Sequence, residues 1–129
     1  MGETTRKRVL VVDDAALVRL YYRGALERCG FEVVEALNGL EGLEKLLAAP
    51  VDLLVVDVNM PQMDGLTFVD SVRRQPLPLA STPVLVASTE SGPQDLAAAR
   101  AAGANFYVVK PVGQEALAEY AKMLCGVAA

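Results

Sequence analysis

Four charged residues stand where three apolar stretches of the chain end. Asp13 and Asp14 follow RVLVV, Asp57 follows VDLLVV, and Lys110 follows FYVV. A buried strand has no need of a carboxylate at its end, and carboxylates brought close together repel one another unless a cation joins them. If the fold brings these residues together, they predict a site that binds a metal ion.

Apolar, β-branched stretches alternate along the chain with segments of helical length. The apolar stretches predict strands at 8–12, 32–36, 52–56, 83–87 and 106–110. The remaining segments predict helices at 14–29, 38–48, 64–74, 93–102 and 113–125. This alternation is typical of an α/β fold, in which helices cover both faces of a parallel sheet. We expect an irregular loop at 75–82 and a capping serine, Ser91, before the fourth helix.

The strands of a parallel sheet all run in one direction, so their carboxyl ends lie at the same edge. Asp13, Asp14, Asp57, Ser88 and Lys110 all fall at this edge, although they are far apart in sequence. Taken alone, two adjacent aspartates are also typical of a helix N-terminus, and a serine at a strand end often makes only a local turn bond. It is the convergence of all five that indicates a chemical site.

The composition excludes several classes of function. A net charge of −4 offers no basic surface for nucleic acid, and no apolar stretch approaches the roughly 20 residues that span a membrane. The N-terminus lacks the apolar segment of a signal peptide. We therefore expect a cytoplasmic monomer that binds neither nucleic acid nor membranes, with residues 1–129 forming one domain (core about 8–126) and no output domain.

Histidine is absent, and the two cysteines are isolated. Without histidine the chain has no Ser-His-Asp triad, no Cys-His pair and no residue that could become phosphohistidine. A phosphohistidine must therefore come from a partner. Cys29 and Cys125 form no CxxC motif and suit small core or edge positions, although both fall at ends of predicted helices, where a regulatory disulfide is an alternative.

Four motifs in order carry a family resemblance: VVDD at 11–14, VVDVNMPQMDG at 55–65, the Ser-Thr pair at 88–89 and VVKP at 108–111. Over about residues 8–126 the chain resembles a response-regulator receiver domain, most closely the stand-alone chemotaxis (CheY-like) type. The resemblance implies a flavodoxin-like, doubly wound sheet of five parallel strands in the order 2-1-3-4-5, with five helices.

The resemblance assigns a role to each residue at the sheet edge. Asp57 matches the phosphoacceptor, and Mg²⁺ would be held by Asp14, Asp57 and the backbone carbonyl of Asn59, with Asp13 acting through water. Octahedral oxygen coordination with several waters retained is what Mg²⁺ prefers. Lys110, which the family joins to Pro111 by a cis bond, would pair with the phosphoryl oxygens once Asp57 is modified.

A second group matches the family's switch. Ser88 corresponds to the hydroxyl that bonds a phosphoryl oxygen, with Thr89 as its rival, and Tyr107 corresponds to the aromatic residue that turns inward. Asn59 and Glu90 match positions that tune the loss of the phosphoryl group. Thr89 stands where the family has a very small residue, and Val112 stands where it often has phenylalanine.

The implied function is that of a response regulator in a two-component system. A histidine kinase or histidine phosphotransfer protein would donate the phosphoryl group, and the surface of the fourth helix, fifth strand and fifth helix would then bind a target, in chemotaxis the flagellar motor switch. Such a protein is a switch, not an enzyme, and catalyses only its own phosphorylation and dephosphorylation. Alternatives are a phosphate sink or relay, a Mg²⁺-dependent aspartyl phosphatase, which requires an acid where Asn59 stands, and a flavin carrier.

Overall fold

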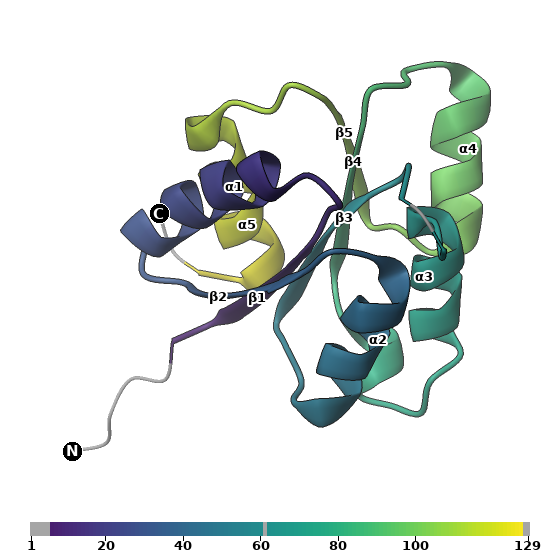
Figure 1. Ribbon diagram of the computed structural model, residues 1–129, viewed down its shortest axis with the longest axis horizontal. Helices are drawn as coiled ribbons and strands as arrows, with labels where there is room; N and C mark the ends of the chain where they lie inside the picture. The colour runs from purple at the N-terminus through teal and green to yellow at the C-terminus, as the bar shows by residue number, and fades with distance from the viewer. Residues whose placement is uncertain (1–5, 61, 128–129) are drawn as a thin grey trace.

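The computed structural model describes residues 6–60 and 62–127, in which strands and helices alternate as expected (Figure 1). The strands are β1 (Arg8–Val12), β2 (Glu32–Ala36), β3 (Leu53–Asp57), β4 (Val84–Ser88) and β5 (Phe106–Val109). The helices are α1 (Ala16–Arg28), α2 (Gly39–Ala48), α3 (Gly65–Arg73), α4 (Pro93–Ala102) and α5 (Gln114–Cys125), and a short 3-10 helix, η1, spans Leu79–Ser81. In these residues no helix has both the length and the apolar character needed to cross a bilayer.

The strands form one parallel sheet in the order β2-β1-β3-β4-β5. The predicted fold class and strand order are therefore confirmed. In this register Val12 pairs with Val56, and Asp57 pairs with Ala87. The ends of β1, β3 and β4 consequently lie side by side, with Asp13 and Ser88 each one residue beyond these pairs.

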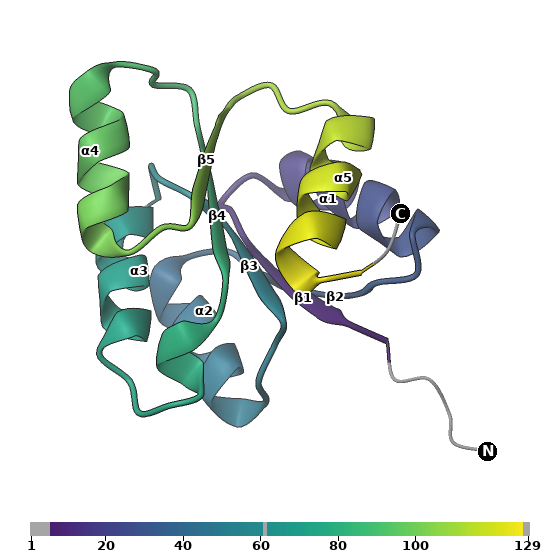
Figure 2. The same cartoon turned by 180° about the vertical axis from the view of Figure 1, so that it is seen from behind.

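Alternation along each strand produces two separate cores. Val9, Val11, Leu53 and Val55 point to the face covered by α1 and α5, where they pack with Leu26, Leu117 and other buried residues. Their neighbours in sequence, such as Leu10 and Val56, point to the opposite face and pack against α2 and α3, including Phe68. Both views show α1 and α5 on one side of the sheet and α2, α3 and α4 on the other (Figures 1 and 2). Burial on both faces explains why the strands are continuously apolar.

The boundaries differ from the predicted ones by a residue or two, and two local features differ as well, the connection at 75–82 and the cap of α4. β3 begins at Leu53 and includes Asp57, because the backbone of this charged residue still pairs with β4. The connection at 75–82 is not wholly irregular, because η1 forms within it. The cap of α4 is Gly92, not Ser91, and the Asp95 carboxylate accepts a hydrogen bond from the Gly92 N–H at 3.1 Å.

The two cysteines are free and lie near opposite ends of α5. Cys29 follows α1 and lies beside Gln114 and Ala118, in the first half of α5. Cys125 is the last residue of α5, and its Sγ lies 3.9 Å from the Asp52 carbonyl oxygen. Burial raises the pKa of the Cys125 thiol to about 11, so this thiol is unreactive at neutral pH. This arrangement does not favour a disulfide between them.

Candidate functional site

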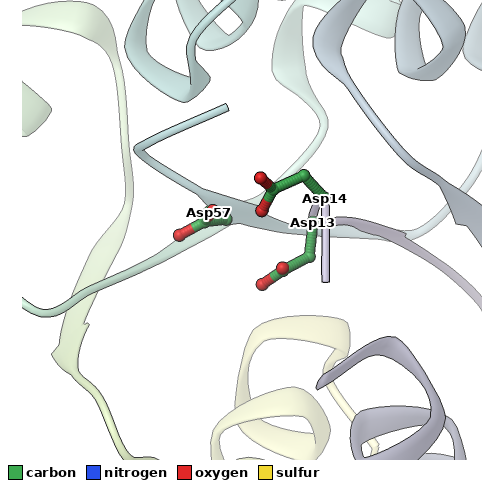
Figure 3. A group of neighbouring side chains, drawn as sticks. All are labelled: Asp13, Asp14 and Asp57. Carbon is green, nitrogen blue, oxygen red and sulfur yellow. The ribbon is translucent and has the colours of Figure 1, made fainter. Parts of the chain in front are cut away.

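Three carboxylates meet at the carboxyl edge of the sheet. Asp13 and Asp14 follow β1, and Asp57 ends the adjacent β3; ligand oxygens of the three lie within 4.8 Å of one another. The side chains of Asp13 and Asp14 diverge from the end of β1, and the Asp57 carboxyl group lies at the end of the adjacent strand (Figure 3). Asp13 and Asp57 are buried, with 1% and 8% of their surface exposed, whereas Asp14 is exposed.

Lys110 joins this cluster from the end of β5. Its Nζ lies 3.0 Å from Asp13 Oδ2 and 3.0 Å from Asp57 Oδ1. The bond to Pro111 is cis, as the resemblance implied. The sequence had suggested a partner for the phosphoryl group only, but Lys110 already pairs with two carboxylates. Three carboxylates with one ammonium still leave two negative charges uncompensated.

The titration of Asp57 and Lys110 reflects this balance. Burial raises the pKa of Asp57, and the charges of Asp13 and Asp14 raise it further, which together outweigh the hydrogen bond from Lys110. Burial alone would lower the pKa of Lys110, but its hydrogen bonds to Asp57 and Asp13 outweigh burial and raise it. Lys110 is therefore a cation at neutral pH, and the cluster as a whole favours a further cation.

The donor set fits a small divalent cation. All three side-chain donors are carboxylate oxygens, the ligands that Mg²⁺ prefers, and the exposed position of Asp14 leaves one side of the cluster open to water. Asn59, whose carbonyl was predicted as a further ligand, is exposed two residues beyond Asp57. The alternative of a simple helix cap does not hold for the aspartate pair, because the N-cap of α1 is Ala15.

The two candidate hydroxyls differ in their surroundings. Ser88, the last residue of β4, is 1% exposed, and its Oγ accepts a hydrogen bond from the Glu90 N–H at 3.1 Å. Thr89 is exposed and lines an apolar pocket beside Lys110. The structure therefore places Ser88 in the buried edge with Asp57, and it also contains the local turn bond that was the alternative interpretation of this serine.

Tyr107 lies in β5, next to the connection between β4 and α4. Its hydroxyl donates a hydrogen bond to the Glu90 carbonyl at 2.7 Å, while its ring packs partly against the core of α2 and α3. The tyrosine is half-buried and bonded to the same connection as Ser88. A movement of that connection would therefore shift the hydrogen-bond partners of both the Ser88 and the Tyr107 side chains.

Sequence reasoning missed two residues of α1 near the site. Tyr22 is buried and lines the pocket beside Lys110; burial raises its pKa, and the pKa also responds to the charges of Lys110, Asp13 and Asp57. Arg19 donates a hydrogen bond to the Asp13 carbonyl. The i, i+4 spacing of Val18 and Tyr22 could have indicated the buried face of this helix, but no sequence signal pointed from Arg19 to Asp13.

Comparison with known proteins agrees with this geometry. The chain is 38% identical to chemotaxis protein CheY1 of Helicobacter pylori over 121 residues, covering 92% of this chain and 97% of that protein. It is 43% identical over 108 residues, 82% of this chain, to a protein-glutamate methylesterase/protein-glutamine glutaminase of Archaeoglobus fulgidus, but the match covers only 30% of that longer protein.

A solved structure and a family model both match most of the chain. Chemotaxis protein CheY4 of Vibrio cholerae superposes with a TM-score of 0.87 at 36% identity, covering 93% of this chain and 99% of that one. Residues 9–122 match the family described as the response regulator receiver domain. With this match, the confirmed strand order and the acidic cluster at the sheet edge, the chain belongs to the response regulator receiver domain family.

Proposed function

We propose that this protein is a phosphorylation switch that accepts a phosphoryl group on Asp57 from a partner's phosphohistidine. The observation that supports this best is the buried Asp57 carboxylate, which lies 3.0 Å from Lys110 and shares the sheet edge with Asp13 and Asp14. An anionic phosphoryl group can approach such a carboxylate only where positive charge offsets the repulsion. Lys110 supplies one such charge.

A bound Mg²⁺ would supply the rest by neutralising charge on the phosphoryl oxygens. Asp14, Asp57 and the Asn59 backbone carbonyl would hold the ion, and Asp13 would act through a water molecule. The N–P bond of the donor breaks as an O–P bond to Asp57 forms, and the imidazole leaves with its electron pair and takes a proton from water. Lys110 would then pair with a phosphoryl oxygen, and the Ser88 hydroxyl would donate to another.

The response would reach a target through the surface of α4, β5 and α5. Tyr107, bonded to the β4–α4 connection, lies on this surface together with the exposed Leu96 and Phe106. Leu96, Phe106 and Tyr107 line a groove between α4 and β5. Because the H. pylori and V. cholerae relatives are named chemotaxis proteins, we propose a chemotaxis target, the flagellar motor switch.

The first test is transfer of the phosphoryl group itself. Incubation with a small acyl phosphate or phosphoramidate and Mg²⁺ should add one phosphoryl group, measured by intact-protein mass spectrometry. Asp57→Asn should abolish the gain, and so should removal of Mg²⁺. Asp70→Asn, which changes an acidic residue of α3 that pairs with Arg74, is the matched control and should be modified normally. Equal modification of the Asp57→Asn protein would rule out the assignment.

The target is tested separately. A motor-switch protein immobilised on resin should retain the phosphorylated protein more strongly than the unphosphorylated one. Equal retention, combined with efficient return of the phosphoryl group to a histidine phosphotransfer protein, would favour the phosphate sink or relay.

A further inference from the structure

We infer that Arg19, held in place by Glu35, is a positioning residue that orients the Asp13–Asp14 segment for binding of the cation. Arg19 Nη1 donates to the Asp13 carbonyl oxygen at 2.6 Å, and its Nε donates to Glu35 Oε1 at 2.9 Å. The inference rests on the proposed function, because it concerns the cation of the same site. Arg19 itself does not touch the reacting atoms.

Asp13 is fixed on every side. Its N–H donates to the Ala36 carbonyl at 3.1 Å, its Oδ1 accepts from the Ala15 N–H at 2.9 Å, and its Oδ2 accepts from Lys110 at 3.0 Å. The Arg19 contact adds the carbonyl, the remaining polar group of this residue. The carbonyl belongs to the peptide plane that it shares with the N–H and Cα of Asp14, so fixing it also fixes the point from which the Asp14 side chain leaves the backbone.

Asp14 depends on this backbone restraint. Its side chain is exposed, and within the described residues no hydrogen bond holds its carboxylate. Its neighbour Asp13, in contrast, is held through both carboxylate oxygens. Asp14, a proposed ligand of the cation, is therefore held in position through its backbone, and Arg19 restrains the peptide that precedes it. A ligand oriented in advance loses less conformational freedom on binding.

Arg19 is in turn held by a network based on β2. Glu35 accepts from Arg19 through one oxygen and from Arg23 at 2.6 Å through the other, and its backbone carbonyl accepts from Lys45. Burial would raise the pKa of Glu35, but hydrogen bonds from Arg23 and Arg19 outweigh it and lower the pKa. Glu35 is therefore ionised at neutral pH and keeps the guanidinium of Arg19 against the end of β1.

Arg23 provides a matched control, because it binds the same carboxylate but makes no contact with Asp13. If Arg19 acted only on fold stability, Arg19→Ala and Arg23→Ala would have the same effect on Mg²⁺ affinity. Long-range charge predicts the opposite sign from positioning, since removing a cation near three carboxylates should strengthen the binding of another cation. Arg19→Lys keeps the charge, but one ammonium group cannot reproduce the two separate contacts of the guanidinium.

The test is Mg²⁺ affinity, measured by isothermal titration calorimetry without a phosphodonor, with thermal unfolding recorded for each variant. We expect Arg19→Ala to weaken Mg²⁺ binding about 10-fold or more, which is the loss typical when a group that orients metal ligands is removed. Arg19→Lys should also weaken Mg²⁺ binding. Arg23→Ala should stay within about 2-fold of the unmodified protein, since it leaves the Asp13 contact in place. Unchanged or tighter Mg²⁺ binding in the two Arg19 variants would overturn this inference but not the proposed function. An equal loss of Mg²⁺ affinity in Arg23→Ala would do the same. Absence of Mg²⁺ binding by the unmodified protein would overturn the proposed function as well.

Discussion

At the scale of single residues, Asp57 carries an electrostatic cost in the folded protein. Its carboxylate is buried beside two others, and one ammonium group does not compensate all three. Its raised pKa means that the folded protein holds the Asp57 proton more tightly than the unfolded chain does. The free energy of unfolding therefore falls as pH rises from the unfolded-state pKa of Asp57 through its raised folded-state pKa, and it stays lower above that range. The carboxylate proposed to accept the phosphoryl group therefore destabilises the fold when it is ionised.

This cost predicts that Asp57→Asn is more stable than the unmodified protein at pH 7 in buffer without divalent cations. The gain should be about 1 kcal/mol, or about 3 °C in the midpoint of thermal unfolding. Below the unfolded-state pKa of roughly 3.9 the group is protonated in both states, so the difference should vanish on acidification. Differential scanning calorimetry across this pH range measures the difference. A variant less stable than the unmodified protein at pH 7, or a difference in stability that grows on acidification, would contradict the argument.

At the scale of elements, the start of α3 packs backbone against backbone on the end of β3. The Gly65 N–H donates to the Val58 carbonyl at 2.8 Å, and a Cβ at position 65 would lie 2.1 Å from the Asp57 carbonyl oxygen. Only glycine lets the start of α3 approach Asp57 this closely. The start of α3 therefore rests on the backbone of Asp57, the proposed phosphoacceptor.

Gly65→Ala should therefore destabilise the protein by about 2 kcal/mol or more, because backbone atoms must move to admit the methyl group. Gly24→Ala is the control: it lies inside α1, and its Cβ would meet only Arg28 Nη1 and Gln114 Nε2, at 3.6 and 3.7 Å. That change should stabilise the protein by about 0.5–1 kcal/mol through helix propensity. Urea denaturation measures both, and shifts of the same sign would refute the packing argument.

At the scale of the whole molecule, Arg73 ties together the end of the protein opposite the site. Its guanidinium donates to the carbonyls of Gly103, Ala80 and Thr82 and to Asn105 Oδ1, at 2.7 to 3.0 Å. These acceptors belong to the η1 segment and to the connection between α4 and β5. Burial lowers the pKa of Arg73, yet a guanidinium remains protonated at neutral pH.

Arg73→Ala should cost about 3 kcal/mol, because several carbonyls lose their partner at once. The neighbouring Arg74 is the control, since its side chain is 77% exposed and pairs only with Asp70. Arg74→Ala should stay within about 0.5 kcal/mol of the unmodified protein. Guanidinium-induced unfolding of both variants would test this, and a loss below 1 kcal/mol for Arg73→Ala would show that water satisfies the carbonyls.

Sequence patterns predicted the strands and helices and the edge where the carboxylates meet, because these depend on local periodicity and on the direction of parallel strands. The order of the strands in the sheet came from the family resemblance. The contacts of Lys110, Arg19 and Arg73 were not predictable in the same way. Lys110 and Asp13 are 97 positions apart, and Arg73 reaches acceptors 30 and more positions away. Contacts of long flexible side chains, whether to carboxylates or to main-chain carbonyls, leave no periodic signal, so they become visible only once the backbone is folded.

The single hydrogen bond of the Tyr107 hydroxyl to the Glu90 carbonyl has a quantitative consequence. A bond of this kind contributes about 1 kcal/mol net, which corresponds to a factor of about five between two orientations of the ring. With this bond as the whole difference between the orientations, an inward ring would be present in a sizeable minority of unmodified molecules. Under the switch role proposed for Tyr107, the protein would then give a basal signal without any donor, and its response would depend on the concentration of the target as well as on the extent of modification.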